Sequence, residues 1–378
     1  MISRPSHGAP PKPNDIAGTD SRLEASIGLT EQEVDAIEET QPGATATSPA
    51  NLPLSAWQQI AKRVWVMAGF HNLSLLAAGT AFFAFLAITP LLAATVMTYG
   101  LLGDVETVQN QMETISAIVP PEAAVLIETQ LLTVVETSSG VTGVTLVISL
   151  IFALYGAMRA ASGLIGALNI INSEHESRNM FSVALRAAGM TLAAIMIALT
   201  GLVSGGLVAW LQTQTSPLIG PFADDLYQLI TWAVAMLLGS SGFALIMKYG
   251  PDRRAAKWRW LSPGSILATF TWVAISFGFS LYVRYVSDYS ATYGSLSAVV
   301  VFLMWLFLTC YAILIGALLN AEIERQTLID TTVGIDRPLG ERGAVMADSA
   351  VSIAPDSEIL DKKRRRQAAR EARKAASH

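Results

Sequence analysis

The chain has 378 residues, of which 52% are hydrophobic and only 15% are charged, whereas soluble domains usually carry about 25% charged residues. This composition excludes an ordinary soluble domain as the bulk of the chain. The formal net charge of -5 averages two opposite ends: residues 1–50 carry eight acids against three basic side chains, and residues 362–374 carry eight basic side chains against one acid. The single cysteine, Cys310, excludes a disulfide within the chain.

The N-terminal segment 1–53 is rich in proline, serine, threonine, glycine and acidic residues. It is predicted to be a disordered cytoplasmic tail, because so few large apolar side chains cannot offset the entropy of ordering the chain. No apolar signal core precedes Leu75, so the first hydrophobic span is expected to act as an uncleaved insertion signal. Just before it, Leu54–Phe70 has an apolar face beside Lys62 and Arg63, which predicts a helix lying in the cytoplasmic membrane interface.

Six apolar stretches follow, and each is long enough to cross about 30 Å of hydrocarbon with about 20 helical residues. They are Leu75–Leu102, Val141–Ala161, Ala187–Leu211, Leu229–Met247, Leu261–Leu281 and Leu296–Leu319. The sequence therefore predicts an all-α, polytopic integral membrane protein with a bundle of about six transmembrane helices.

The loops between these stretches alternate in charge. Residues 104–140 carry six acids and no basic side chain, whereas Arg178 and Arg186 follow the second stretch and residues 248–259 hold five basic side chains. Arg284, after the fifth stretch, is the exception. Because basic loops stay on the cytoplasmic side, both termini are predicted to be cytoplasmic, in a bacterial inner membrane.

The acidic loop also has a helical pattern. Apolar residues recur from Val105 to Val119, and Pro120-Pro121 interrupts the pattern before a second apolar-faced stretch that ends at Val135. Two short outer amphipathic helices are predicted. They pack over the outer mouth of the bundle or lie on the lipid surface, and the sequence leaves both arrangements open.

Residues 327–378 are again polar and end in the basic run 362–374, so they are predicted to be a second disordered cytoplasmic tail. The predicted organisation is therefore an acidic tail over 1–53, a six-helix transmembrane domain over 54–326, and a C-terminal tail over 327–378.

Arg159 is the main charged residue at predicted membrane depth, where charge is expensive and is often functional. If the second helix starts near Val141, Arg159 lies toward its cytoplasmic end and can extend to the headgroups. If the helix instead ends near Asn172, Arg159 lies in the middle of the membrane and needs a partner. Small residues around it, such as Gly156 and Ala160, are read as sites of close helix packing.

The loop between the fourth and fifth stretches combines basic and aromatic side chains. Tryptophan at headgroup level, together with lysine and arginine, is typical of contact with anionic lipid. The predicted lipid-contact residues are Arg253, Arg254, Lys257, Trp258, Arg259 and Trp260. The alternative is that the basic side chains only fix the orientation of the protein in the membrane. That alternative does not explain the two tryptophans.

Motifs for catalysis are not found in the sequence. It has no phosphate-binding Walker loop, no dinucleotide-binding glycine motif, no HExxH and no paired cysteines. His175 lies between Glu174 and Glu176, but adjacent helical positions point apart and a metal site needs convergent ligands. No enzymatic activity, metal, cofactor or nucleic-acid partner is therefore expected.

Several separated motifs resemble the BrkB/YihY family of bacterial inner-membrane proteins, formerly labelled ribonuclease BN. They are AFFAFLAITPLLA at 81–93, GLIGALNIIN at 163–172 followed by Arg178, KYGPDRRAAKWRWLSPG at 248–264, YGSLSAVVVFLMWL at 293–306 and IGALLNAEIE at 315–324. The resemblance covers about residues 55–326. The resemblance implies a six-helix membrane protein tied to envelope integrity and, in pathogens, to virulence.

The candidate functional polar residues are Arg159, Asn169, Arg178, Tyr293, Gly294, Asn320 and Glu322. Asn320 and Glu322 could coordinate a cation or close a gate, or they could cap a helix end in water. The expected function is binding or transport of lipid-like molecules, and the alternative is a scaffold for envelope machinery that transports nothing. A ribonuclease, after the former label of the family, ranks last. Membrane lipids with anionic headgroups are the expected partners; envelope proteins and a second copy of the chain are left open.

Overall fold

The computed structural model describes residues 29–86, 143–219, 222–285 and 296–349. Within these residues every extended regular element is a helix, and the β-structure there is limited to an isolated bridge between Ala256 and Thr332. The predicted all-α membrane fold is confirmed. The chain divides into two compact units, which we describe separately: unit 1 contains residues 29–60, 253–260 and 322–349, and unit 2 contains the described residues of 61–252 and 261–321.

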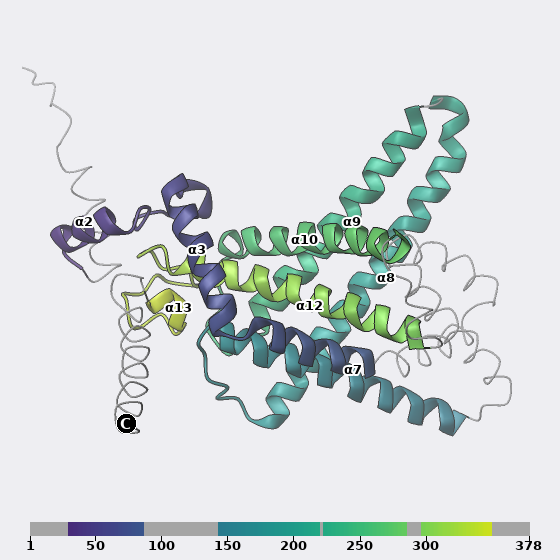
Figure 1. Cartoon of the computed structure of the whole chain (residues 1–378), viewed down its shortest axis with the longest axis horizontal. Coiled ribbons are helices and arrows are strands. Elements are labelled where there is room, and N and C mark those ends of the chain that lie inside the picture. The colour runs from purple at the N-terminus through teal and green to yellow at the C-terminus, as the bar shows by residue number, and fades with distance from the viewer. Residues whose placement is uncertain (1–28, 87–142, 220–221, 286–295, 350–378) are drawn as a thin grey trace, which may run out of the picture. The chain divides into compact units, whose positions relative to one another are not determined.

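Unit 2 is built from long apolar helices (Figure 1). Their bounds are α7 (Gly143–Ile171), α8 (Met180–Ile219), α9 (Phe222–Tyr249), α10 (Trp258–Tyr285) and α12 (Ser297–Glu324), the last two of which also contribute residues to unit 1. Four helices of the described chain are long and apolar enough to cross a membrane, or five if one bent pair counts as a span. The predicted count of six stays a prediction.

The bent pair consists of α3 (Leu54–Phe70) and the helix Leu73–Leu86, which meet at 63°. The predicted helix Leu54–Phe70 is confirmed with the same bounds. Asn72 has a positive φ of 51°, a left-handed conformation that asparagine tolerates, and it turns the chain between the two helices. The rest of the first predicted span and both predicted outer helices lie outside the described residues.

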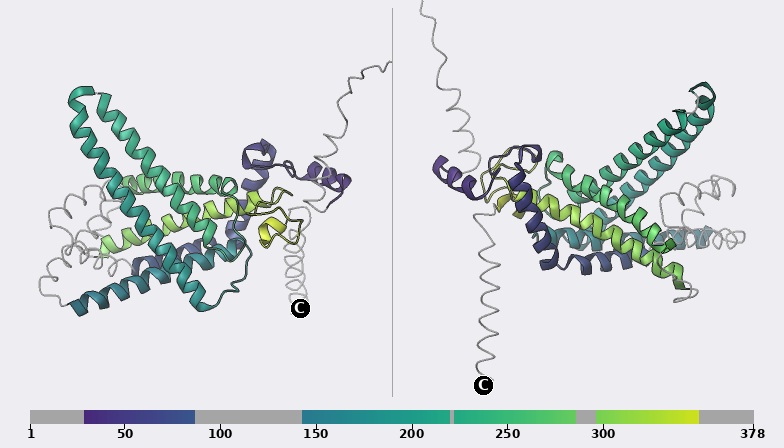
Figure 2. Two further views of the ribbon diagram at one scale, coloured as in Figure 1. Left: turned by 180° about the vertical axis from the view of Figure 1, so that it is seen from behind. Right: turned by 45° about the horizontal axis from the view of Figure 1, so that its top comes forward.

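Helix α12 is the most enclosed helix of unit 2. Half of its most apolar 18-residue window is buried, whereas no residue of the corresponding window of α8 is buried. Phe302 and Trp305 of α12 pack with Phe279 of α10 in one apolar cluster. Within this unit, α8 and α9 form a hairpin whose connecting end projects away from α10 and α12, as the views in Figures 1 and 2 agree.

Unit 1 corrects the predicted tails. It contains α2 (Glu31–Thr40), a 3-10 helix (Pro49–Asn51) and α13 (Val345–Asp348). Ala44, Leu328 and Ile329 form a buried cluster, and the Leu328 N–H donates to the Ala44 carbonyl at 2.7 Å. The prediction of disorder is therefore wrong for residues 29–53 and 327–349. Residues 1–28 and 350–378 lie outside the described residues, where disorder stays a prediction.

Arg342 holds the C-terminal part of unit 1 together from inside. Its fully buried guanidinium donates to the carbonyls of Leu328, Arg337 and Ala347 at 2.5, 3.1 and 2.8 Å. Three carbonyls that are distant along the chain therefore share one donor group. This arrangement adds a polar anchor to the small apolar cluster of the segment.

We expect Arg342→Met to loosen residues 327–349, because it leaves these buried carbonyls without their donor at a cost of about 2–4 kcal/mol. Limited proteolysis of the full chain should then cut this segment faster. Arg337→Met is the matched control, since the exposed Arg337 side chain donates to the Glu341 carbonyl at 3.3 Å. Equal cleavage of both variants would contradict the role given to Arg342.

Candidate functional site

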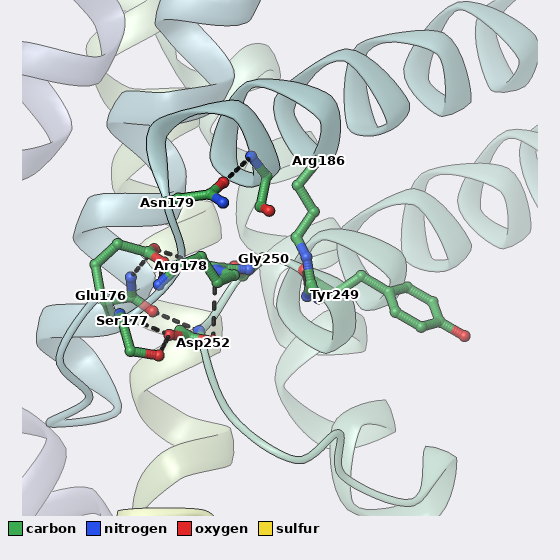
Figure 3. A network of polar contacts seen from close by, with 10 residues as sticks. Glu176, Ser177, Arg178, Asn179, Arg186, Tyr249, Gly250 and Asp252 are labelled. Atoms are coloured by element: carbon green, nitrogen blue, oxygen red, sulfur yellow. Dashed lines mark hydrogen bonds and ion pairs between the residues drawn. The ribbon is translucent and has the colours of Figure 1, made fainter.

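Two of the predicted polar residues meet in one cluster of unit 2, which we call the loop latch (Figure 3). It consists of Asn169, Glu176, Ser177, Arg178 and Asp252. Asn169 is in the last turns of α7, the next three residues are in the α7–α8 loop, and Asp252 is in the loop that follows α9. The latch therefore joins parts of the chain that are more than 70 residues apart.

Arg178 is the cation of the loop latch. Its Nε and Nη2 each donate to one carboxylate oxygen of Glu176 at 2.6 Å, the two-pronged geometry that makes arginine–carboxylate pairs strong. Nη2 also donates to the Gly250 carbonyl at 3.2 Å, and Nε lies 3.4 Å from Asp252 Oδ1. The Arg178 side chain is only 9% exposed, whereas the Glu176 side chain is 32% exposed, so water reaches this pair from the Glu176 side.

Asn169 and Ser177 complete the loop latch. The Asn169 Oδ1 accepts the backbone N–H of Asp252 at 2.7 Å, and its Nδ2 donates to Glu176 at 2.8 Å. The backbone N–H and hydroxyl of Ser177 donate to Asp252 Oδ2 at 2.8 and 2.6 Å. Since Asn169 is only 4% exposed, its amide stabilises the turn after α9 from within the bundle.

The carboxylates of the loop latch are held in their charged form. The hydrogen bond from Arg178 holds the pKa of Glu176 below its usual value. Burial alone would raise the pKa of Asp252, but the hydrogen bonds from Ser177 outweigh it and lower that pKa. Because both folded-state pKa values are depressed, the latch contributes stability at neutral pH and loses it as the pH falls through those values.

The local sequence explains why the loops meet here. A side chain at Gly250 would have its Cβ 2.6 Å from the Leu168 side chain and 2.7 Å from the Ile246 carbonyl, so only glycine allows this approach of α9 to α7. Asn179 Oδ1 accepts the Ser182 N–H at 2.8 Å and caps the start of α8. Arg186 of α8 donates to the Tyr249 carbonyl at 3.1 Å.

Asn320 has a different role in unit 2, at the crossing of α10 and α12. Its Oδ1 accepts the Gly264 N–H at 2.7 Å and its Nδ2 donates to the Leu261 carbonyl at 3.0 Å. Pro263 lies in this part of α10 and cannot donate a backbone hydrogen bond. Asn320 therefore satisfies backbone groups where the helix pattern is interrupted.

Arg159 lies apart from the loop latch, in the exposed part of α7. Its guanidinium carbon is 5.2 Å from the centre of the Phe83 ring, a distance typical of a cation–π contact. Helix α7 runs from Gly143 to Ile171, so it includes both the predicted start near Val141 and the predicted end near Asn172. The depth of Arg159 in the membrane stays a prediction.

Glu322, in unit 1, is fully buried and its carboxylate lies 3.1 Å from Arg325 Nη1. The predicted water-exposed helix cap is therefore wrong. A buried carboxylate must be paired to remain charged, and Arg325, one helical turn later, supplies the charge. Tyr293 and Gly294 lie outside the described residues, so their candidacy stays a prediction.

The basic loop of unit 1 is engaged mainly with protein groups. Arg253 pairs with Glu324 at 2.5 Å with both side chains almost fully buried, and Trp260 is completely buried. Lys257 donates to the Asp330 carbonyl at 2.9 Å and to Asp336 at 2.8 Å. The predicted lipid contact is therefore wrong for Arg253 and Trp260.

The other predicted lipid-contact residues differ among themselves. Arg254 donates to the Ile335 carbonyl at 3.4 Å, a long contact. Trp258 is 51% exposed and Arg259 is also exposed, and for these two residues lipid contact stays a prediction. Sequence reasoning missed Ser177 and Asp252 as members of the loop latch, although Asp252 lies in the motif KYGPDRR at 248–254.

Over the part of the chain that the structure describes, no three histidine, cysteine, aspartate or glutamate side chains gather in a way that could hold a metal ion.

Comparisons with known proteins agree with this architecture. The family model of the virulence factor BrkB matches residues 64–334. The ribonuclease-like protein YfkH of Bacillus subtilis is 27% identical over 50% of this chain and 70% of its own. A UPF0761 membrane protein of Idiomarina loihiensis is 27% identical over 46% of this chain and 59% of its own, and one of Kangiella koreensis is 22% identical over 70% and 63%.

The chain thus spans less than two thirds of these two UPF0761 relatives. No solved structure matches. The UPF0761 relatives carry the name of membrane proteins, in agreement with the apolar helices of unit 2, and the family match covers most of the chain. The protein is a multi-pass membrane protein that belongs to the virulence factor BrkB family.

Proposed function

We propose that this protein is a non-enzymatic inner-membrane protein that contributes to envelope integrity by moving lipid-like molecules across the bilayer. The observation that carries this proposal is the asymmetry of unit 2. The loop latch ties α7, α8 and α9 together at one end, whereas the α8–α9 hairpin leaves α10 and α12 toward the other end (Figures 1 and 2).

The helix contacts support this asymmetry. Ser240 and Ser265 link α9 to α10 with hydroxyls 3.4 Å apart, and Gly239 faces Thr269. Both contacts lie in the half of α9 that leads to the loop latch. Outward-facing side chains are exposed in both halves of α9, with Leu229 at 66% and Leu237 at 68%, as expected of side chains that face hydrocarbon. A bundle held at one end and separated at the other is suited to a protein that opens its two ends in turn.

The charge pattern indicates on which side of the membrane the loop latch lies. Arg178 and Arg186 lie in or beside it, and Lys248 precedes the Gly250–Asp252 turn. Basic residues close to membrane spans remain in the cytoplasm, so we assign the latch, and with it both termini, to the cytoplasmic face of the inner membrane. The described state is then closed toward the cytoplasm.

Locking the loop latch with a reversible disulfide tests this proposal. In a Cys310→Ala background, Ser177→Cys with Asp252→Cys replaces two side chains whose oxygens are 2.6 Å apart, close enough for a disulfide to be attempted. The purified protein is placed in vesicles with a fluorescent phospholipid, and its movement between leaflets is measured by quenching from outside. We expect oxidation to abolish translocation and reduction to restore it.

The control is the Ser177→Cys single variant, which cannot form the bond and should translocate equally with and without oxidant. Translocation that is absent from the unlocked protein would reject transport and favour the scaffold. The name of the Bacillus relative suggests a third outcome, degradation of RNA by the same preparation, which would contradict the non-enzymatic assignment.

A further inference from the structure

The exposed face of α7 forms a straight stripe. Its exposed positions are Ile148, Ile151, Tyr155, Arg159, Gly166 and Ile170, which are separated by three, four or seven residues. This spacing places all of them on one side of the helix. The opposite side, with Leu164, Ile165 and Leu168, is buried. A charged side chain therefore lies in the middle of an otherwise mostly apolar face that no described neighbour covers.

Arg159 lies too deep to reach a membrane surface. Asn169 marks the polar boundary, because it binds the loop after α9. Arg159 is ten residues earlier, or about 15 Å along the helix, which is half of a hydrocarbon core of about 30 Å. An arginine side chain extends about 7 Å, since each of its bonds is about 1.5 Å long. The guanidinium of Arg159 therefore reaches only about half of the distance to the headgroups.

The described surroundings only partly satisfy this charge. The Phe83 ring faces the guanidinium at 5.2 Å, and a ring face attracts a cation. The guanidinium nevertheless carries a positive charge and five N–H donors. In hydrocarbon these donors need hydrogen-bond acceptors, and an acceptor that carries negative charge also offsets the positive charge.

We propose that Arg159 binds the phosphate of an anionic phospholipid whose acyl chains lie along the exposed face of α7. This inference rests on the proposed function and names its substrate class. The planar guanidinium matches a phosphate with two parallel hydrogen bonds, and the Tyr155 hydroxyl, one turn away, can donate a third. Ile148, Ile151 and Ile170 offer the apolar surface that acyl chains require. A lipid that crosses the bilayer must bring its headgroup through the middle of the bilayer, which is the depth at which Arg159 would bind it.

Retention of lipid by the purified full chain tests this site. The protein is released from nanodiscs that contain equal amounts of phosphatidylglycerol and phosphatidylcholine, and the retained lipids are counted by native mass spectrometry. We expect the wild type to retain phosphatidylglycerol preferentially. Arg159→Gln should weaken that preference by about tenfold, the effect of losing a charge-assisted hydrogen bond.

Two further variants keep the result interpretable. Arg159→Lys preserves the charge but lacks the planar guanidinium, so its preference for phosphatidylglycerol should be intermediate. This variant also provides the test if Arg159→Gln fails to accumulate. Lys62→Gln removes one charge from the exposed side of α3 and should leave the preference unchanged. If Lys62→Gln abolishes the preference as strongly as Arg159→Gln, general surface charge explains the binding and the site is rejected.

The outcome separates this site from the proposed function. An unchanged preference in Arg159→Gln, or a full preference in Arg159→Lys, overturns the phosphate clamp even if vesicles show translocation that the locked latch blocks. A lost preference in Arg159→Gln, with Lys62→Gln unaffected, supports the lipid site even if translocation is absent. The lipid count therefore tests whether Arg159 binds lipid, whereas the disulfide lock tests whether the protein transports lipid.

Discussion

Gly264→Leu is expected to prevent the folded protein from accumulating in the membrane, and Gly264→Ala to lower its thermal stability strongly. A Cβ at position 264 would overlap the Gly316 carbonyl oxygen and lie 2.5 Å from the Asn320 side-chain amide. The carbonyl belongs to the backbone of α12 and cannot rotate away. Overpacking usually costs about 1–3 kcal/mol and occasionally more, and this site should lie at or above the upper end because α10 and α12 would have to separate.

The matched control for this prediction is Gly278→Ala, on the same helix. A Cβ at position 278 has no atom within 4 Å, so alanine should be tolerated there. Both proteins are heated in the same detergent and the folded fraction is measured by gel filtration after each step. Equal melting temperatures for the two variants would show that α10 and α12 do not approach as closely as described.

The helices were predictable because their signal is local. An apolar run long enough to cross a bilayer is present in the residues themselves, and the amphipathic pattern gave α3 its bounds. Helix ends were less predictable: α8 begins at Met180 and ends at Ile219, well outside the predicted Ala187–Leu211. Hydropathy detects the apolar part of a helix, whereas the helix continues until its backbone is capped, as Asn179 does here.

The polar contacts were less predictable because they join distant parts of the chain. Asn169 and Arg178 were chosen as candidates from motifs, but their partner Asp252 is 83 and 74 positions away. Unit 1 was missed for the same reason. Residues 327–349 have the composition of a tail, and their order depends on the internal hydrogen bonds of Arg342 and on long-range contacts such as Leu328 with Ala44.

Removing Glu324 is expected to destabilise unit 1 by about 3–5 kcal/mol, the usual effect of leaving one member of a buried ion pair without the other. Its Oε2 accepts Arg253 Nη2 at 2.5 Å and the Thr331 hydroxyl at 3.0 Å. Glu324→Ala therefore leaves a cation that is only 4% exposed without its carboxylate. Hydrogen exchange of residues 327–333 in the full chain should rise sharply, while exchange in α8 should not change.

The double variant Arg253→Met with Glu324→Met distinguishes the cost of an orphaned charge from the value of the pair. Two apolar side chains of similar length avoid the unpaired charge, so the double variant should regain most of the protection that Glu324→Ala loses. Asp336→Ala is the exposed comparison: Asp336 and its partner Lys257 are 53% and 24% exposed, Lys257 keeps its hydrogen bond to the Asp330 carbonyl, and the change should cost at most about 1 kcal/mol. If the double variant is as unprotected as Glu324→Ala, the stabilisation comes from the specific hydrogen bonds of Glu324 and not from charge neutralisation.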